Sequence, residues 1–216
     1  MKNELCWNTV SPLLKEVLLD LMNEKIFNPF RLVGGTALSL QFGHRVSVDI
    51  DLFTGEEYDS VDFNSVKQFL KHKYQFYETS SIELVGIGTY FKVGNSKNDF
   101  VKIDAFYNEP YIFDEIKNEN IRMASDKEII AMKLDVLLRG GRKKDFWDLH
   151  YFLNKYTIDE MISFYEKRYP YNGISTLKNQ FINFENADND VEPICLLNKS
   201  WEIIKLDFYE KLNLRH

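Results

Sequence analysis

The stretch Arg31–Phe53 reads RLVGGTALSLQFGHRVSVDIDLF, and this stretch decides the fold. A short apolar segment ends in Gly34 and Gly35, and an apolar run that favours a helix follows over 36–42. Residues 48–53 then alternate strictly, with apolar side chains on one side and two aspartates on the other. The pattern predicts a strand, a tight turn, a short helix and a second strand, which is the beginning of an α/β unit.

The glycine pair has the character of an anion site. A strand that ends in Gly34 and Gly35 and leads into a helix allows backbone amides to approach a phosphate at the helix N-terminus. A phosphate loop of the Walker type would end in Gly-Lys-Ser/Thr, and that ending is missing here. Double glycines also occur in ordinary turns, so the pair alone does not identify a phosphate site and must be combined with other features of the chain.

Three aspartates supply such a feature. Asp49 and Asp51 share one face of the predicted strand, and Asp104 lies in a second alternating segment, Val101–Ala105, that could pair beside it. Carboxylate oxygens suit Mg²⁺, and two such ions would relieve the repulsion among three carboxylates and support phosphoryl or nucleotidyl transfer. The alternative is that these aspartates form the ordinary solvent-facing side of two strands.

The chain changes character at Ser125, after which nearly every segment favours a helix. We therefore expect an α/β core over 1–124 and a helical C-terminal region over 125–216 that packs on the core. Outside the opening stretch, the predicted helices cover roughly 12–22, 64–77, 126–139, 144–155, 158–168, 174–184 and 199–212, the predicted strands cover 81–85, 89–93 and 100–107, and an exposed loop covers 186–192.

Composition limits the classes of protein and partner. With 33 acidic and 27 basic residues the 216-residue chain has a formal charge of −6, which argues against extensive tracking of nucleic-acid phosphates. The segment 130–150 is nevertheless net positive, which leaves room for a local basic cleft. The two cysteines are too few for a disulfide framework, and the longest uncharged run, 32–44, is too short to span a bilayer. We expect a cytoplasmic protein without a membrane segment.

The predicted helix over 126–139 contains an unusual lysine. Lys133 falls within an apolar arc, so its ammonium must either reach out to solvent or face a cleft. Arg139 points away from Lys133 on an ideal helix, so the two could act together only if the helix ends or bends near Gly140 and Gly141. The alternative is that Arg139 is a surface arginine near the C-terminus of the helix. Asp145 and Asp148 lie on one side of the next helix, where they either buttress the lysine, bind substrate or face solvent.

These motifs together resemble a known group of enzymes. Gly-Gly-Thr at 34–36, then twelve residues, then Asp49-Ile-Asp51 and a later strand aspartate resemble the DNA polymerase β-like nucleotidyltransferase superfamily. More narrowly, GGTAL at 34–38 with Arg45-x-Ser47-x-Asp49 looks like the AbiEii/AbiGii-type toxin family. The segments 133–139 and KDFWDL at 144–149 look like the C-terminal helical motifs of that family.

The resemblance implies a polymerase β-like α/β core with a mixed sheet and flanking helices, followed by a helical C-terminal region. It also implies a metal and nucleotide site. Asp49, Asp51 and Asp104 would bind two Mg²⁺ ions. The residues implied in contacts with the NTP or in its support are Gly34, Gly35, Thr36, Arg45, Ser47, Lys133, Arg139 and Asp148.

The implied activity is Mg²⁺-dependent transfer of a nucleoside monophosphate from an NTP to an acceptor, with release of pyrophosphate. The implied setting is a toxin–antitoxin or phage-defence system, with a cognate antitoxin as partner and tRNA 3′ ends as the favoured acceptor. A protein hydroxyl is the main alternative acceptor. A catalytically idle nucleotide-binding or partner-binding module is the other alternative, and the presence of all three carboxylates disfavours it.

Overall fold

The computed structural model describes residues 4–80 and 87–213. The chain divides into two compact units. Unit 1 comprises Met1–Phe42 and Ser47–Ala124, and unit 2 comprises Ser125–His216 together with the short segment Gly43–Val46. No feature of the sequence predicted that four residues between the glycine-rich helix and the aspartate strand belong to unit 2. Across the described residues, no helix has the length and apolar character needed to cross a bilayer.

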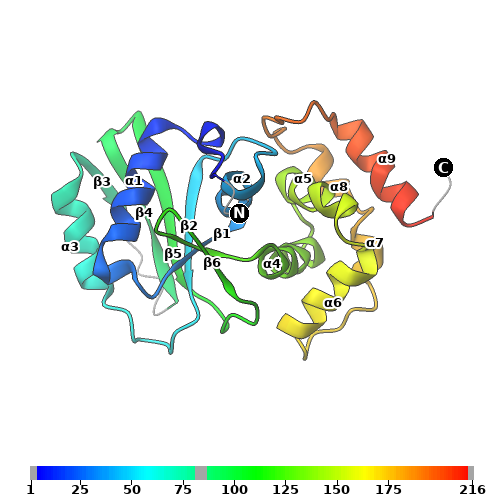
Figure 1. Ribbon diagram of the computed structural model, residues 1–216, viewed down its shortest axis with the longest axis horizontal. Coiled ribbons are helices and arrows are strands. Elements are labelled where there is room, and N and C mark those ends of the chain that lie inside the picture. Colours follow the sequence, from blue (N-terminus) through cyan, green and yellow to red (C-terminus); the bar gives the residue numbers. More distant parts are fainter. Residues whose placement is uncertain (1–3, 81–86, 214–216) are drawn as a thin grey trace. The chain divides into compact units, whose positions relative to one another are not determined.

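Unit 1 is built on a mixed sheet that joins seven strands of the described residues (Figure 1). The order across the sheet is β3-β4-β5-β2-β1-β7-β6. Neighbours β2 and β5 run parallel, as do β1 and β7, and the other neighbouring pairs are antiparallel. The strands are β1 (Arg31–Val33), β2 (Asp49–Thr54), β3 (Phe76–Thr79), β4 (Gly88–Ser96), β5 (Asp99–Tyr107), β6 (Glu115–Asn118) and β7 (Ile121–Ala124). The mixed sheet with flanking helices confirms the predicted fold class.

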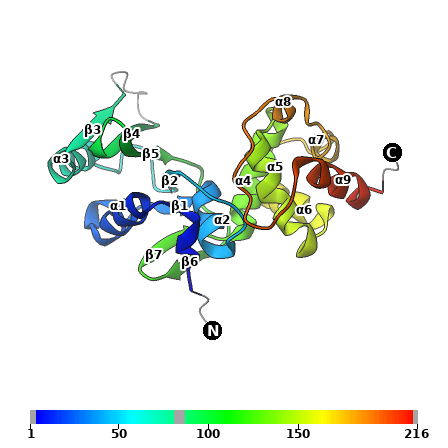
Figure 2. The ribbon, with the colours of Figure 1, turned by 90° about the horizontal axis from the view of Figure 1, so that it is seen from above.

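One face of the sheet is covered by α1 (Pro12–Asn23) and α3 (Phe63–Lys73), and α2 (Gly34–Phe42) lies on the other side (Figure 2). Ser11 accepts a hydrogen bond from the amide of Leu14, so α1 begins with a capped end, and its apolar face is fully buried. Ile50 and Leu52 are also fully buried, which leaves the alternate residues of β2 on the opposite face. The core of unit 1 therefore lies away from the aspartates.

Unit 2 is helical, as the sequence predicted. Its elements are α4 (Asp126–Leu138), α5 (Lys143–Tyr151), α6 (Ile158–Arg168), α7 (Leu177–Gln180), α8 (Glu185–Asp188) and α9 (Trp201–Lys211). Helix α4 packs against α5, α6 and α7, and α5 packs against α8 and α9. A fully buried ion pair joins Arg168 of α6 to Glu128 of α4. The Gly43–Val46 segment is held within this unit, since Val46 donates a backbone hydrogen bond to Ile194 (2.9 Å).

Several predicted boundaries were wrong. The helix expected over 64–77 ends at Lys73, and the edge strand β3 follows because the backbone there pairs with β4. The hairpin of β6 and β7 was missed, since its turn residues Glu119 and Asn120 both adopt positive φ without a glycine to signal it. The helix expected over 174–184 is the single turn α7, and α8 occupies part of the expected loop over 186–192. The strand expected over 81–85 lies outside the described residues.

Candidate active site

Two adjacent strands of unit 1 bring the three predicted aspartates to one face. Asp49 and Asp51 alternate with the buried Ile50 on β2, so both carboxylates are on the face away from the core, where they are half-buried. Strand β5 runs parallel beside β2, with Asp104 directly opposite Asp51. Neighbouring strands lie about 4.8 Å apart, and residues in register point to the same side. The register therefore places the three aspartates on the same face of the sheet.

Gly34 fits closely against this group. Its φ of +67° belongs to the left-handed region, and a Cβ atom there would lie 2.4 Å from Asp51 Oδ2. Only glycine satisfies both conditions without displacing the carboxylate. Helix α2 begins at Gly34, so the unpaired amides of its first turn start beside Asp51. This is an arrangement in which an anion at the helix N-terminus and a cation on the carboxylate would be neighbours.

The next residues of the motif fix the strand to the helix. The fully buried Thr36 hydroxyl hydrogen-bonds to the Ser47 hydroxyl (2.8 Å) and to the backbone carbonyl of Asp49. These bonds tie the first turn of α2 to the beginning of β2, and thereby fix the level of Asp49 relative to Gly35. Thr36 and Ser47 thus connect the glycine turn to the aspartate strand, and their implied contact with the nucleotide, or support of it, stays a prediction.

The donor set suits a hard divalent cation, because three carboxylates on two neighbouring strands offer oxygen ligands on one face. A cationic group already occupies part of this face, since Lys102 Nζ lies 2.6 Å from Asp104 Oδ2. As the side chains are placed, residues 4–80 and 87–213 contain no cluster of three acidic, histidine or cysteine residues that could hold a metal ion. The residues present therefore fit Mg²⁺ in chemistry and register, and their side chains would have to converge to bind it.

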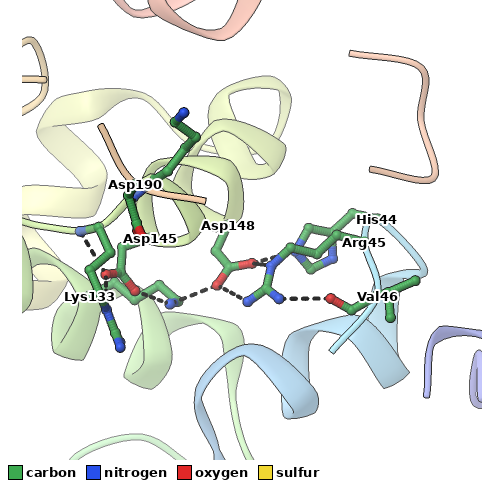
Figure 3. A network of polar contacts seen from close by, with 9 residues as sticks. His44, Arg45, Val46, Lys133, Asp145, Asp148 and Asp190 are labelled. Carbon is green, nitrogen blue, oxygen red and sulfur yellow. Dashed lines mark hydrogen bonds and ion pairs between the residues drawn. The ribbon is translucent and has the colours of Figure 1, made fainter. Parts of the chain in front are cut away.

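A second polar group lies in unit 2 and is centred on Asp148 (Figure 3). The fully buried carboxylate accepts two hydrogen bonds from Arg45, from Nε at 2.6 Å and from Nη2 at 2.8 Å. His44 Nε2 lies 2.6 Å from the same carboxylate. Lys133 Nζ lies 2.7 Å from Asp148 and 2.7 Å from Asp145. Two cations and two anions, Arg45, Lys133, Asp145 and Asp148, thus balance within this buried network.

The electrostatics of the network keep it charged. Burial alone would raise the pKa of Asp148, but the charges of Arg45 and Lys133 outweigh that effect and hold the pKa well below its usual range. Burial would likewise raise the pKa of Asp145, and Lys133 reverses the shift. Burial would lower the pKa of Lys133, but Asp145 and Asp148 raise it instead. All of these groups are ionised at neutral pH.

This placement answers the questions that the sequence left open about unit 2. Lys133 does not reach out to solvent, because it is buried and forms ion pairs with Asp145 and Asp148; the first of the two predicted alternatives was wrong. A solvated face for the two aspartates was also wrong, and the buttressing role is the one observed. Arg139 stands apart from the network, exposed and paired with Asp135 at 2.6 Å.

His44 was missed by sequence reasoning. The four histidines of the chain are dispersed without zinc-like spacing, and only the position of His44 beside Arg45 in the motif distinguishes it. In the structure His44 is buried, and both His44 and Arg45 of the Gly43–Val46 segment contact the carboxylate of Asp148. The adjacent His44 and Arg45, between the predicted helix and the predicted strand, were the available sign that this segment binds a carboxylate.

Comparisons with known proteins show which family the chain resembles. A family model described as nucleotidyl transferase AbiEii toxin, type IV toxin–antitoxin system, matches residues 16–212. An uncharacterized protein of Aquifex aeolicus is 30% identical over 211 residues, which cover 92% of this chain and 93% of that protein.

Solved structures share the fold. A candidate nucleotidyltransferase from H. pylori superposes with a TM-score of 0.60 at 18% identity, covering 92% of this chain and 91% of that one. MenT4, a nucleotidyltransferase toxin from Mycobacterium tuberculosis, gives a TM-score of 0.57 at 15% identity and covers 92% and 80% of the two chains. The match of the family model over most of the chain, on a nucleotidyltransferase fold, places this protein in the AbiEii nucleotidyltransferase toxin family.

Proposed function

We propose that this nucleotidyltransferase transfers a nucleoside monophosphate from an NTP to an acceptor hydroxyl in a Mg²⁺-dependent reaction, with a tRNA 3′ end as the favoured acceptor. The observation that carries the proposal is the register of Asp51 and Asp104 on parallel neighbouring strands, with the start of α2 pressed against Asp51. Three aspartates on one face of neighbouring strands, beside a glycine-rich helix start, supply the oxygen ligands and backbone amides that a metal–triphosphate complex requires.

In the proposed reaction the acceptor oxygen forms a bond to the α-phosphorus of the NTP, and the bond from that phosphorus to the β-phosphate oxygen breaks. Pyrophosphate leaves, and the acceptor proton passes to Asp104. Bound to Asp49, Asp51 and Asp104, Mg²⁺ would neutralise charge on the attacking and leaving oxygens. The amides of Gly34 and Gly35 would face the triphosphate at the start of α2.

The network in unit 2 has a supporting function in this proposal. Asp148 fixes Arg45, and Arg45 lies four residues before Asp49 in the chain. We propose that Lys133 and Asp148 act by holding this segment and that Arg139, which is exposed, contributes positive charge toward the nucleotide. A cognate antitoxin and a role in phage defence belong to the same proposal, and the family membership supports the first of them.

The test uses each of the four α-labelled NTPs with Mg²⁺ and either total tRNA or a cell lysate. Label should pass to tRNA with wild-type protein, and Asp49→Ala should abolish the transfer. The matched control is Asp99→Asn, because Asp99 is exposed at the other end of β5. Label that appears in protein and not in RNA would favour the protein hydroxyl as acceptor. Transfer that survives Asp49→Ala would refute the proposed mechanism, and absence of any transfer would favour the idle binding module.

A further inference from the structure

A lysine of unit 1 for which the sequence predicted no role lies against the aspartate face. Lys102 is two residues before Asp104 on β5, so both side chains are on the same side of the strand. Its ammonium lies 2.6 Å from Asp104 Oδ2, and the two side chains are 40% and 21% exposed. An acidic face that is to receive cations therefore already contains one cation of its own.

The register of the sheet gives Lys102 further neighbours. On one side it lies opposite Asp49 of β2, and on the other opposite Lys92 of β4. Lys92 is paired with Glu78 of β3 at 2.6 Å. The ammonium of Lys102 thus forms an ion pair with the carboxylate of Asp104, and Asp49 lies opposite Lys102 on the neighbouring strand.

The ring of Tyr90 gives the ammonium another contact. Tyr90 lies opposite Asp104 on β4, and Lys102 Nζ lies 5.9 Å from the centre of its ring. This distance is at the outer limit at which a cation is attracted to an aromatic face. A lysine side chain has four rotatable bonds, so the ammonium can leave the carboxylate and remain against the ring without a change in the backbone.

We propose that Lys102 is the counter-ion of Asp104 in the metal-free protein, and that it gives up this carboxylate when a divalent cation binds. Without the lysine, three carboxylates on neighbouring positions would repel one another. With it, a cation must displace the ammonium in order to bind Asp104. Lys102 therefore lowers the metal affinity of the empty site and acts as a positioning residue for the carboxylates. The inference rests on the proposed metal-dependent function.

The alternative is an ordinary surface ion pair with no bearing on metal binding. The two hypotheses predict different metal affinities when Lys102 is replaced by an uncharged residue. An exposed pair of this kind contributes little to stability, so Lys102→Met should fold. If the ammonium competes with the metal, the same change should tighten metal binding by about fivefold, which is the upper range for such a pair. Lys102→Arg keeps the charge and should keep the affinity of the wild type.

The experiment measures Mn²⁺ binding to nucleotide-free protein from the paramagnetic resonance signal of the free ion. Lys102→Met should bind about fivefold more tightly than the wild type. Lys92→Met is the matched control, since it removes a lysine from the same face one strand away, and its affinity should stay within about twofold. In an Asp104→Asn background, Lys102→Met should no longer tighten binding, because its partner is gone.

Unchanged or weaker Mn²⁺ binding by Lys102→Met would overturn the inference, as would an equal gain in Lys92→Met. Nucleotidyl transfer by the wild type, measured in parallel, separates this failure from failure of the proposed function. Transfer by the wild type with no effect of Lys102→Met on Mn²⁺ refutes the counter-ion alone. A wild type that neither binds Mn²⁺ nor transfers label refutes both.

Discussion

Replacement of Asp148 by asparagine should destabilise the protein strongly, and the structure permits an estimate of the amount. The carboxylate is fully buried and accepts hydrogen bonds from Arg45 at 2.6 and 2.8 Å, with Lys133 at 2.7 Å. Asparagine keeps the shape of the side chain but removes the charge. Its NH₂ group would need an acceptor, whereas Arg45 and Lys133 can only donate hydrogen bonds. The network would then hold two buried cations against the single anion of Asp145.

Breaking a buried ion pair in this way costs about 3–5 kcal/mol, whereas a protein of this kind has a total free energy of unfolding of about 5–15 kcal/mol. Asp148→Asn should therefore lower the midpoint of urea unfolding sharply, measured by far-ultraviolet circular dichroism. Asp207→Asn is the matched control. Asp207 also pairs with a histidine, His150 at 2.7 Å, and a lysine, Lys199 at 3.1 Å, but it is partly exposed. Its loss should cost about 1 kcal/mol or less.

A loss below about 1 kcal/mol for Asp148→Asn, or a loss equal to that of Asp207→Asn, would refute the reasoning. Either result would mean that the buried charges do not depend on one another as the distances indicate. The control also excludes the possibility that any carboxylate bound to a histidine and a lysine has the same effect.

Three further predictions concern the glycine turn, Arg139 and the pH dependence of the buried network. Gly34→Ala should abolish transfer and lower the free energy of unfolding by about 1–2 kcal/mol, because the new Cβ meets Asp51 Oδ2 at a positive φ. Gly173→Ala, which has open space around it, should change neither the transfer activity nor the free energy of unfolding measured in urea. Arg139→Ala should alter the unfolding free energy by less than about 0.5 kcal/mol, since its pair is an exposed i,i+4 contact, so a raised KM for NTP would report nucleotide binding. The difference in unfolding free energy between wild type and Asp148→Asn should narrow below about pH 4. The ionised Asp148 stabilises the folded state at pH values above the ordinary pKa of an aspartate, and this stabilisation is lost as the pH falls toward the lowered pKa. A difference that stays constant down to about pH 2 in acid–urea titrations would contradict this.

The aspartate strand and its glycine turn could be predicted because local patterns determine them. Alternation with period two places Asp49 and Asp51 on one face whatever the partners of the strand, and Gly34 is required by the close approach of one carboxylate. The parallel pairing that brings Asp104 beside them was only a possibility in the sequence. It depends on which strands become neighbours in the sheet, and that choice is made by packing between distant segments.

The network in unit 2 shows where sequence reasoning fails. Lys133 looked misplaced in an apolar arc because its partners, Asp145 and Asp148, lie on another helix. Arg45 and His44 join Asp148 across more than a hundred residues of sequence, so no local pattern could indicate the contact. Periodicity reports which face of a helix is buried, but it cannot report that a buried charge finds partners there.

The measurement that tests the central claim most directly is the initial rate of label transfer from α-labelled NTP by Asp104→Asn, with Asp99→Asn of the same strand as control. A lost metal ligand removes several kcal/mol of transition-state stabilisation, so the rate of Asp104→Asn should fall about a thousandfold. Asp99 is exposed and lies opposite Ser96 at the far end of β5, and its variant should retain the wild-type rate within about twofold. An Asp104→Asn protein that folds and keeps more than about a tenth of the wild-type rate would contradict the account.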